Sequence, residues 1–245
     1  MICVLSDIHG NERRFNSILR QINLQSGDTL YVLGDVIDRH PGGIRILRRI
    51  MSMPNVKMLL GNHEYMMLRA LGYPRDDNWD DGRAMGHWYR NGGNLTHNAF
   101  KRIRKTLRQE MIEYLLSLPV NIDVRVNGED YKLVHAAPME EYDPQDRYKN
   151  PIHFAVWKRF ESDYTFGGDY TLVFGHTPTR YFHEKIPMEI WHGNRMIGID
   201  CGSGYPETGP DSKYGRLACL RLDDGRVFYS EENCGDQETP QPSEV

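Results

Sequence analysis

The chain has 245 residues, a formal net charge of −4 and 39% hydrophobic residues, a composition typical of globular proteins. The small negative charge gives no overall attraction to nucleic acid or to an anionic membrane, so we expect neither as a partner. No apolar run approaches the roughly 20 residues of a membrane-spanning helix. Met1 to Asp7 lack the features of a signal peptide, and the cysteines show no C-x-x-C spacing, so we expect a cytoplasmic protein with free thiols.

The first third of the chain repeats a strand, a loop and a helix three times. Apolar runs predict buried strands at 2–5, 29–33 and 56–60. Apolar residues at helical spacing predict helices around 15–22, 44–50 and 66–71, and Asn11 can cap the first of them. This order favours a sheet with helices on its faces. Such sheets bind ligands at the carboxyl ends of their strands, so residues that follow each run are candidates for a site.

The middle of the chain departs from this rhythm. Residues 73–94 are rich in Asp and Trp and form either a solvated insertion or a wall beside the site, since long loops in compact domains are often functional. A helix is expected from about 95 to 116. It carries a basic run between Lys101 and Arg108, which is usually a solvated face and alternatively a docking surface.

The second half is richer in predicted strands. Runs at 122–126 and 131–134 flank Asn127-Gly128, which is a hairpin signal. Further strands are expected at 170–174, 196–199, 217–222 and 227–229. Residues 205–214 resemble an insertion that could border the active site. We predict an α/β (α+β) fold of two packed mixed β-sheets flanked by helices, with one catalytic domain over 1–230 and a polar, mobile tail over 231–245.

Polar residues gather where the predicted strands end. They are Asp7, His9, Asp35, Asn62, His135 and His176. This set offers oxygen and nitrogen donors and no thiolate, which suits Mn²⁺, Fe²⁺ or Zn²⁺. If Asp35 is shared by two ions, it holds them roughly 3.5–4 Å apart, the spacing used for phosphoryl displacement. The alternatives are ordinary ones: an Asp-x-His turn, Asn62 as a helix cap, and a buried, hydrogen-bonded His63.

Five blocks along the chain resemble the calcineurin-like metallophosphoesterases. They are Asp7-Ile8-His9-Gly10, Gly34 to Arg39, Gly61-Asn62-His63-Glu64, Val134-His135 and Gly175-His176. The Asp-Arg of the second block and the Asn-His-Glu of the third look like the serine/threonine phosphoprotein phosphatase branch, which in bacteria also includes symmetrical diadenosine tetraphosphatase. The resemblance covers about residues 1–230 and implies an αββα sandwich.

The resemblance implies a role for each of these positions. Asp7 and His9 would hold one metal ion, Asn62, His135 and His176 would hold a second, and Asp35 would bridge the two. His63 would be the general acid for the leaving alcohol, with Asp38 orienting it, while Arg39 and Arg159 would grip phosphate oxygens. The other histidines are not expected to be ligands: His87, His97, His153, His183 and His192. The role of His40 stays open.

The sequence therefore predicts a dinuclear-metal phosphomonoesterase that attacks phosphoserine or phosphothreonine esters with a metal-bridging hydroxide. Two divalent ions are expected, with Mn²⁺ favoured and Fe²⁺ or Zn²⁺ also fitting. The first alternative is hydrolysis of dinucleoside polyphosphates or another small phosphate ester. The second is a metal-bound scaffold that binds partners without catalysis. The sequence specifies no oligomeric state.

Overall fold

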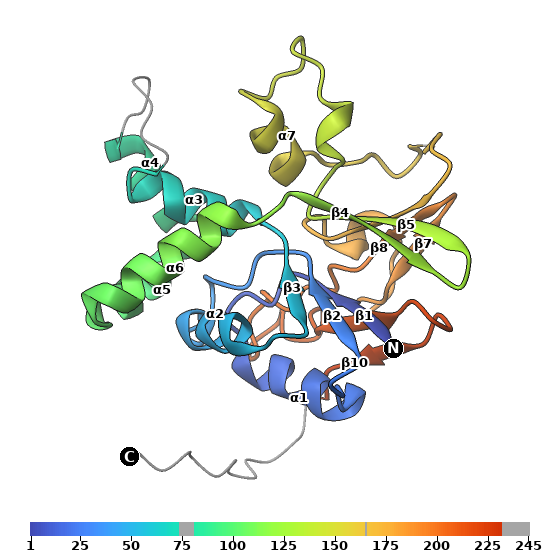
Figure 1. The fold of residues 1–245 in the computed structure, drawn as a ribbon, viewed down its shortest axis with the longest axis horizontal. Coiled ribbons are helices and arrows are strands. Elements are labelled where there is room, and N and C mark those ends of the chain that lie inside the picture. The colour runs from blue at the N-terminus through green and yellow to red at the C-terminus, as the bar shows by residue number, and fades with distance from the viewer. Residues whose placement is uncertain (74–80, 165, 232–245) are drawn as a thin grey trace.

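The computed structural model describes residues 1–73, 81–164 and 166–231 (Figure 1). Two five-stranded mixed sheets lie at its centre, which confirms the predicted fold class. The first sheet has the order β10-β9-β1-β2-β3, formed by Val227–Tyr229, Ala218–Arg221, Ile2–Leu5, Thr29–Val32 and Val56–Met58. The second has the order β4-β5-β6-β8-β7, formed by Asn121–Val126, Glu129–Val134, Thr171–Phe174, Met196–Gly198 and Trp191–Gly193.

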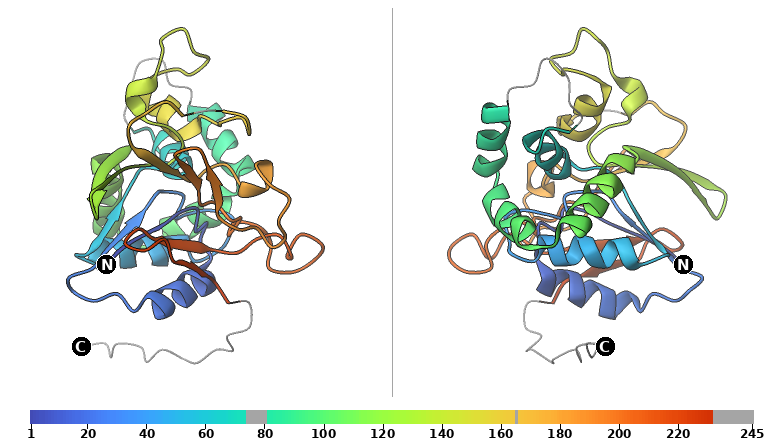
Figure 2. Two further views of the ribbon diagram at one scale, coloured as in Figure 1. Left: turned by 90° about the vertical axis from the view of Figure 1, so that its right-hand side faces the viewer. Right: turned by 60° about the vertical axis from the view of Figure 1, so that its left-hand side comes forward.

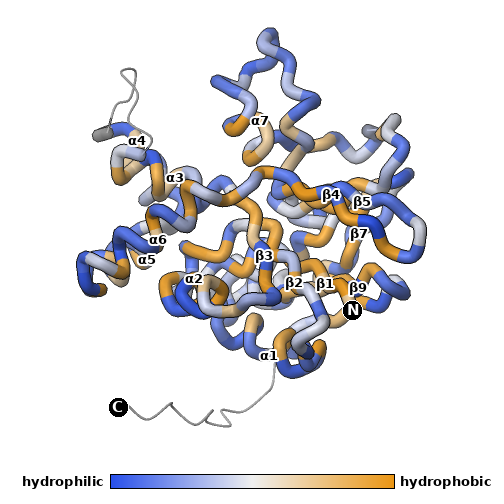
Figure 3. Tube along the Cα trace, in the orientation of Figure 1, coloured by the Kyte–Doolittle hydropathy of each residue, from blue (hydrophilic) through white to orange (hydrophobic). Residues whose placement is uncertain are grey.

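Side chains of β1 alternate between two cores, because successive residues of a strand point to opposite faces. Cys3 and Leu5 pack with the apolar faces of α1 (Glu12–Ile22) and α2 (Gly43–Ser52). Val4 points the other way and joins the core between the two sheets. Figure 3 shows these strands as a hydrophobic centre beneath more hydrophilic helix and loop surfaces. The three parallel strands β1, β2 and β3 therefore end at one buried edge.

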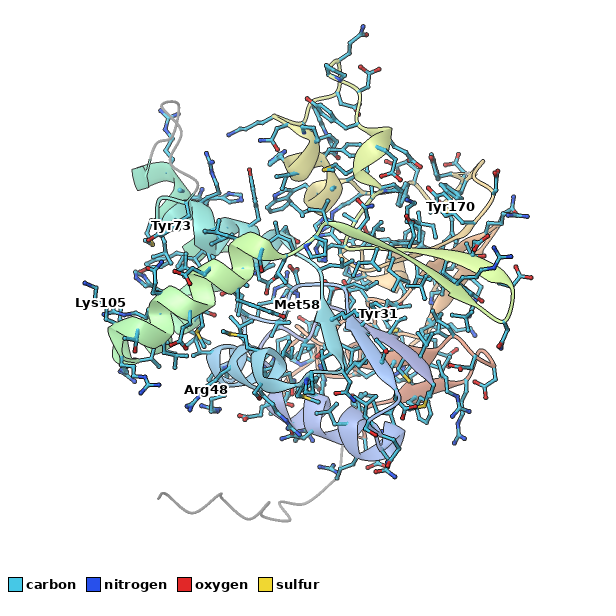
Figure 4. The ribbon with its side chains drawn as sticks, in the orientation of Figure 1. Tyr31, Arg48, Met58, Tyr73, Lys105 and Tyr170 are labelled. Carbon is cyan, nitrogen blue, oxygen red and sulfur yellow. The ribbon has the colours of Figure 1, made fainter. Side chains whose placement is uncertain are left out.

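Four further helices group together beside the sheets: α3 (Asn62–Ala70), α4 (Asp81–Arg90), α5 (Gly93–Arg102) and α6 (Lys105–Ser117) (Figures 1 and 2). The single helix predicted for 95–116 is wrong. Ile103 and Arg104 have extended backbone, with ψ of 156° and 151°, and they separate α5 from α6. Lys105, in the basic run, lies at the outer end of this group, away from the sheets (Figure 4). The docking role of that run stays a prediction.

The purely solvated interpretation of residues 73–94 is also wrong for their second part. Residues 81–90 form α4, and its Trp88 side chain is completely buried; residues 74–80 lie outside the described part of the chain. The sequence pattern did not predict the short α7 (Pro151–Trp157), which covers the outer face of the second sheet with Phe154. It also did not predict strand β7.

Several local expectations are confirmed. Asn11 caps α1 by accepting a hydrogen bond from the backbone N–H of Arg14 at 3.1 Å. Asn127 and Gly128 form the β4–β5 turn with φ of 52° and 91°. Cys3, Cys201 and Cys219 are free and buried. Within the described residues, no helix is long and apolar enough to cross a membrane. Apart from Glu231, the predicted tail lies outside the described residues.

Candidate dinuclear metal centre and active site

The chain turns sharply after each strand that leads to the site. Six predicted site residues have left-handed backbone, with φ between 50° and 73°: Asp7, His9, Asp35, Asp38, Arg39 and His176. Such conformations are unfavourable for residues other than glycine and persist where the surrounding structure holds them, often at functional sites. Here they turn successive polar side chains from the strand ends toward one common space.

Hydrogen bonds from Glu64 hold these turns in place. Its carboxylate accepts hydrogen bonds from four backbone N–H groups: Asp35 at 2.8 Å, Val36 at 2.9 Å, Ile37 at 3.3 Å and Gly61 at 3.2 Å. Burial and the charge of Asp35 raise the pKa of Glu64 to about 8. Glu64 had no predicted role. Its signal is its place three residues after Gly61, where a carboxylate can accept from the N-terminus of a helix.

The first candidate ligand group surrounds His9. Its Nδ1–H donates to the carbonyl of Ile37 at 3.3 Å, so Nε2 carries no proton. Nε2 faces the same space as Asp7 Oδ1, 3.8 Å away, and Asp35 Oδ2, 3.7 Å away. Ligands about 2.1 Å from a shared ion lie roughly 3–4 Å from one another, so these separations fit coordination. Asp7 is fixed through Oδ2, which accepts the N–H of His176 at 2.9 Å. Burial and the charge of Arg39 lower the pKa of His9, which favours the neutral, ligating form.

The second candidate group surrounds His135 and Asn62. The Nδ1–H of His135 donates to the carbonyl of Leu33 at 2.7 Å, which leaves Nε2 as an acceptor. That nitrogen lies 2.8 Å from Asn62 Oδ1 and 3.5 Å from Asp35 Oδ1, which are also acceptors. These donor atoms converge closely enough to share one cation. His176 Nδ1 lies 2.8 Å from the same Asn62 oxygen and completes the group.

The two groups share Asp35, which points Oδ2 toward one and Oδ1 toward the other. Two sets of possible ligand atoms lie close together: His9, Asp35 and His63, and Asp35, His135 and His176. The first set contains His63 in place of the predicted ligand Asp7, whose Oδ1 lies 3.8 Å from His9 Nε2. All of these side chains are buried. The donor set and its geometry fit two divalent ions.

His63 lies between the two groups and a buried carboxylate. Its Nδ1 is 2.7 Å from Asp38 Oδ2, which also accepts the indole N–H of Trp88 at 2.8 Å. Its Nε2 faces the centre, 3.8 Å from Asp35 Oδ2 and 3.3 Å from Arg39 Nη2. Asp38 thus directs Nε2 toward the centre, where it accepts from the Arg39 guanidinium. The contact of Trp88 with Asp38 was not predicted from the sequence.

The two predicted phosphate-binding arginines lie at the exposed rim. Arg39 reaches His63, as described above. Arg159 follows α7, and its charge acts on the centre: burial, His135 and Arg159 together hold the pKa of His176 well below its ordinary value. Trp157, two residues earlier, places its ring 5.8 Å from that of His176.

His40 stands beside the centre without entering it. Its Nε2 lies 3.2 Å from the carbonyl of Tyr205 and so holds the start of the 205–214 segment. The neighbouring Gly204 packs so closely that an added Cβ would lie 2.5 Å from His9 Cδ2. The segment predicted as an insertion therefore borders the centre on the His9 side.

The remaining histidines occupy other places, and among the described residues none belongs to a candidate metal group. His87 and His153 have their rings 5.6 and 6.1 Å from that of Trp157. His97 lies 2.5 Å from the Tyr89 hydroxyl, and His183 lies 3.0 Å from the Glu189 carbonyl. His192 lies on β7.

Known proteins place the chain in a family. The calcineurin-like phosphoesterase model matches residues 1–199. The symmetrical bis(5'-nucleosyl)-tetraphosphatase of Acidovorax ebreus is 27% identical over 183 residues, which is 73% of this chain and 57% of that protein. The chain thus spans little more than half the length of the curated relatives it matches first.

Solved structures show the same fold. A metallophosphoesterase from Sphaerobacter thermophilus has a TM-score of 0.54 at 18% identity, covering 94% of this chain and 86% of its own. A serine/threonine phosphatase from Saccharomyces cerevisiae has a TM-score of 0.54 at 14% identity, covering 98% and 81%. The chain belongs to the calcineurin-like phosphoesterase family, a family of metal-dependent hydrolases of phosphate esters.

Proposed function

We propose that this chain hydrolyses dinucleoside polyphosphates with two divalent ions, of which Mn²⁺ is the first candidate. The observation that carries this proposal is the position of Asp35, with one carboxylate oxygen toward each ligand group. The relatives named symmetrical bis(5'-nucleosyl)-tetraphosphatases support the substrate class. The proposed ligands are Asp7, His9, Asp35, Asn62, His135 and His176.

The residues of the chain divide the work of the reaction. Two bound ions supply positive charge to the phosphate oxygens and lower the pKa of the attacking water. Arg39 and Arg159 meet the equatorial phosphate oxygens, because a planar guanidinium fits them in a bidentate way. His63 donates a proton from Nε2 to the leaving oxygen, and Asp38 holds the ring through Nδ1.

The His63–Asp38 pair favours a second candidate, hydrolysis of phosphoserine or phosphothreonine monoesters. An alkoxide leaves poorly unless it is protonated, whereas a nucleoside diphosphate leaves as a stable anion. The buried Asp38 carboxylate accepts hydrogen bonds from His63 and Trp88 and so orients His63. A proton donor oriented in this way matters most when the leaving group is an alkoxide. The two candidates predict different dependence on His63.

Initial rates with Mn²⁺ test this proposal on three substrates: diadenosine tetraphosphate, a phosphoserine peptide and para-nitrophenyl phosphate. We expect turnover that EDTA abolishes, and a kcat/KM at least about tenfold higher for the tetraphosphate than for the peptide, a difference of about 1.4 kcal/mol. His63→Asn should lower peptide turnover by roughly 10²–10⁴-fold, the usual contribution of a general acid, and tetraphosphate turnover by less.

His192→Asn, on β7, is the matched control and should leave all three rates unchanged. A kcat/KM that is higher for the peptide would establish the phosphoprotein candidate instead. If protein shown to hold two ions turned over none of the three substrates, the hydrolase proposal would be wrong and the scaffold interpretation would replace it.

A further inference from the structure

A cavity lies between the segments that precede and follow α7. Its walls are residues 145–148, from the loop before α7, and residues 158–161 with Tyr164, from the segment after it. None of these residues except Arg159 has a role in the proposed reaction. The cavity is therefore a separate feature that shares one side chain with the active site.

Positive charge exceeds negative charge on the cavity wall. Three cationic side chains, Arg147, Lys158 and Arg159, face two carboxylates, Asp146 and Glu161, in a chain whose net charge is −4. This local excess of one positive charge favours an anionic ligand over a cationic one. Guanidinium groups are well suited to phosphate, since their planar donors match its oxygens.

The cavity wall also has aromatic surface. Arg147 Nη2 lies 3.3 Å from the Tyr148 hydroxyl, with its guanidinium 5.4 Å from the ring centre. Tyr164 is 40% exposed, and its ring packs on Phe160 with centroids 4.8 Å apart. A supported, half-exposed ring offers one face for stacking. Cations beside such a ring are the features that recognise a nucleotide: phosphates on one part and a planar base on the other.

Successive ring contacts connect this cavity to the metal centre. The rings of His176 and Trp157 have their centroids 5.8 Å apart. The centroids of Trp157 and His153 are 6.1 Å apart, and those of His153 and Tyr148 are 5.7 Å apart. Tyr148 in turn lines the cavity. The charge of Arg159, another wall residue, helps to lower the pKa of His176. The cavity wall therefore packs against side chains that surround the metal centre, and Arg159 belongs to the wall while its charge acts on the centre.

We propose that the cavity binds one nucleoside end of the substrate, with Arg147 and Lys158 contacting phosphates beyond the reacting one and Tyr164 stacking on the base. This inference rests on the proposed function, because a dinucleoside polyphosphate carries both groups. A phosphopeptide with acidic neighbours would use the cations but would have no need for the Tyr164 face. The substitution at Tyr164 therefore distinguishes the two classes of substrate.

Steady-state kinetics of Arg147→Ala and Tyr164→Ala test the inference. Each substitution should lower kcat/KM for diadenosine tetraphosphate about tenfold, mainly through KM, since a lost charged hydrogen bond or stacking contact has that effect. The loss for para-nitrophenyl phosphate should be at least about tenfold smaller, because this compound has no group that reaches the cavity. Tyr164→Phe keeps the ring and should restore the activity lost in Tyr164→Ala.

Arg125→Ala is the matched control, because Arg125 is an exposed arginine on β4 whose partner is Asp130. Equal losses on both substrates would show a merely structural role and overturn the inference, as would unchanged kinetics in both cavity variants. A loss for an acidic phosphopeptide that depends on Arg147 and not on Tyr164 would assign the cavity to peptides and overturn it too.

Equilibrium binding of ADP separates this inference from the proposed function. If the wild-type chain did not cleave the tetraphosphate, the proposed function would fail. The cavity inference would still predict ADP binding that weakens about tenfold in Arg147→Ala and Tyr164→Ala. Absence of ADP binding by the wild-type chain would overturn the cavity inference alone.

Discussion

The strand-end loops and the rim around them are built in opposite ways. In the loops, the Asp35 and Asp38 side chains are 1% and 0% exposed, and each carboxylate is held by hydrogen bonds to backbone or ring nitrogens. At the rim, Arg159 is exposed and Tyr164 is 40% exposed. In the proposed reaction, the residues that perform the chemistry and the residues that select the substrate therefore lie in different parts of the molecule. In this reaction, buried loops with left-handed backbone would hold the metals and the acid, while exposed side chains on connecting segments would meet the substrate.

Removal of the shared charge should give the largest effect. Asp35→Asn keeps the shape of the side chain but replaces one anionic oxygen with an amide nitrogen that cannot ligate. We expect both ions to be lost, with a fall in turnover beyond the roughly 10⁴-fold upper value for loss of a general acid. Elemental analysis and the rate with para-nitrophenyl phosphate measure the two losses.

Asp130→Asn is the control for this substitution, because Asp130 is an exposed carboxylate that pairs with Arg125. If Asp35→Asn protein still carried two ions per chain, the sharing of Asp35 between the ligand groups would be wrong.

A smaller effect is expected from adding a methyl group at Gly61, which packs against the loop that carries Asp35. A Cβ at Gly61 would lie 2.4 Å from both the backbone nitrogen and Oδ1 of Asp35, and 2.7 Å from Glu64 Oε2. Gly61→Ala should therefore lower the free energy of unfolding by about 1–3 kcal/mol and weaken metal binding, because backbone must move to admit the methyl group. Urea unfolding and a metal titration measure these changes.

Gly27 provides the comparison, since nothing lies within 4 Å of its added Cβ. Gly27→Ala should leave the stability unchanged or raise it by up to about 1 kcal/mol. Equal destabilisation by the two alanines would mean that the strand-end turn is not held more tightly than an open loop.

The sequence predicts the strand-end loops far better than the rim. Short apolar runs that stop at Asp, Asn or His are local signals, and parallel strands bring their ends together whatever lies between them. The sharing of Asp35 needed the resemblance, because spacing alone leaves turns and caps open. The place of Glu64 three residues after Gly61 signals a helix cap, but the sequence does not show that its carboxylate also accepts from Asp35, Val36 and Ile37.

The contact between Trp88 and Asp38 shows the other limit of prediction. Trp88 lies in a stretch whose composition indicated solvated chain, but its indole reaches a carboxylate from a different block. Gly93 lets the chain pass close to this indole, since a Cβ there would lie 2.3 Å from Trp88 Nε1, but the structure alone reveals that contact. Short α7 had too few residues to show a helical period, so the wall that it builds could not be placed from sequence.

The smallest of these effects is a dependence of the free energy of unfolding on pH, caused by His153 on α7. Burial and the charge of Lys149 lower the pKa of this histidine from 6.5 to about 4. The unfolded chain therefore takes up a proton near pH 6.5 that the folded chain does not. The free energy of unfolding therefore falls as the pH drops from about 6.5 to about 4. Below about pH 4 both states carry the proton, and the contribution of His153 no longer changes. Because the ring is half exposed, solvent reduces the full linkage to about 1 kcal/mol.

His153→Phe should remove this dependence and keep the ring contacts with Tyr148 and Trp157. Urea unfolding at pH 7 and pH 5 should show that the wild-type chain loses up to about 1 kcal/mol more than the variant. Parallel losses in the two proteins would contradict the assignment. The substitution should leave the metal content at pH 7 unchanged, because the ring of His153 packs on Tyr65, Tyr148 and Trp157 and contributes no proposed ligand. A variant that lost its ions would show that rim and centre are not specified separately.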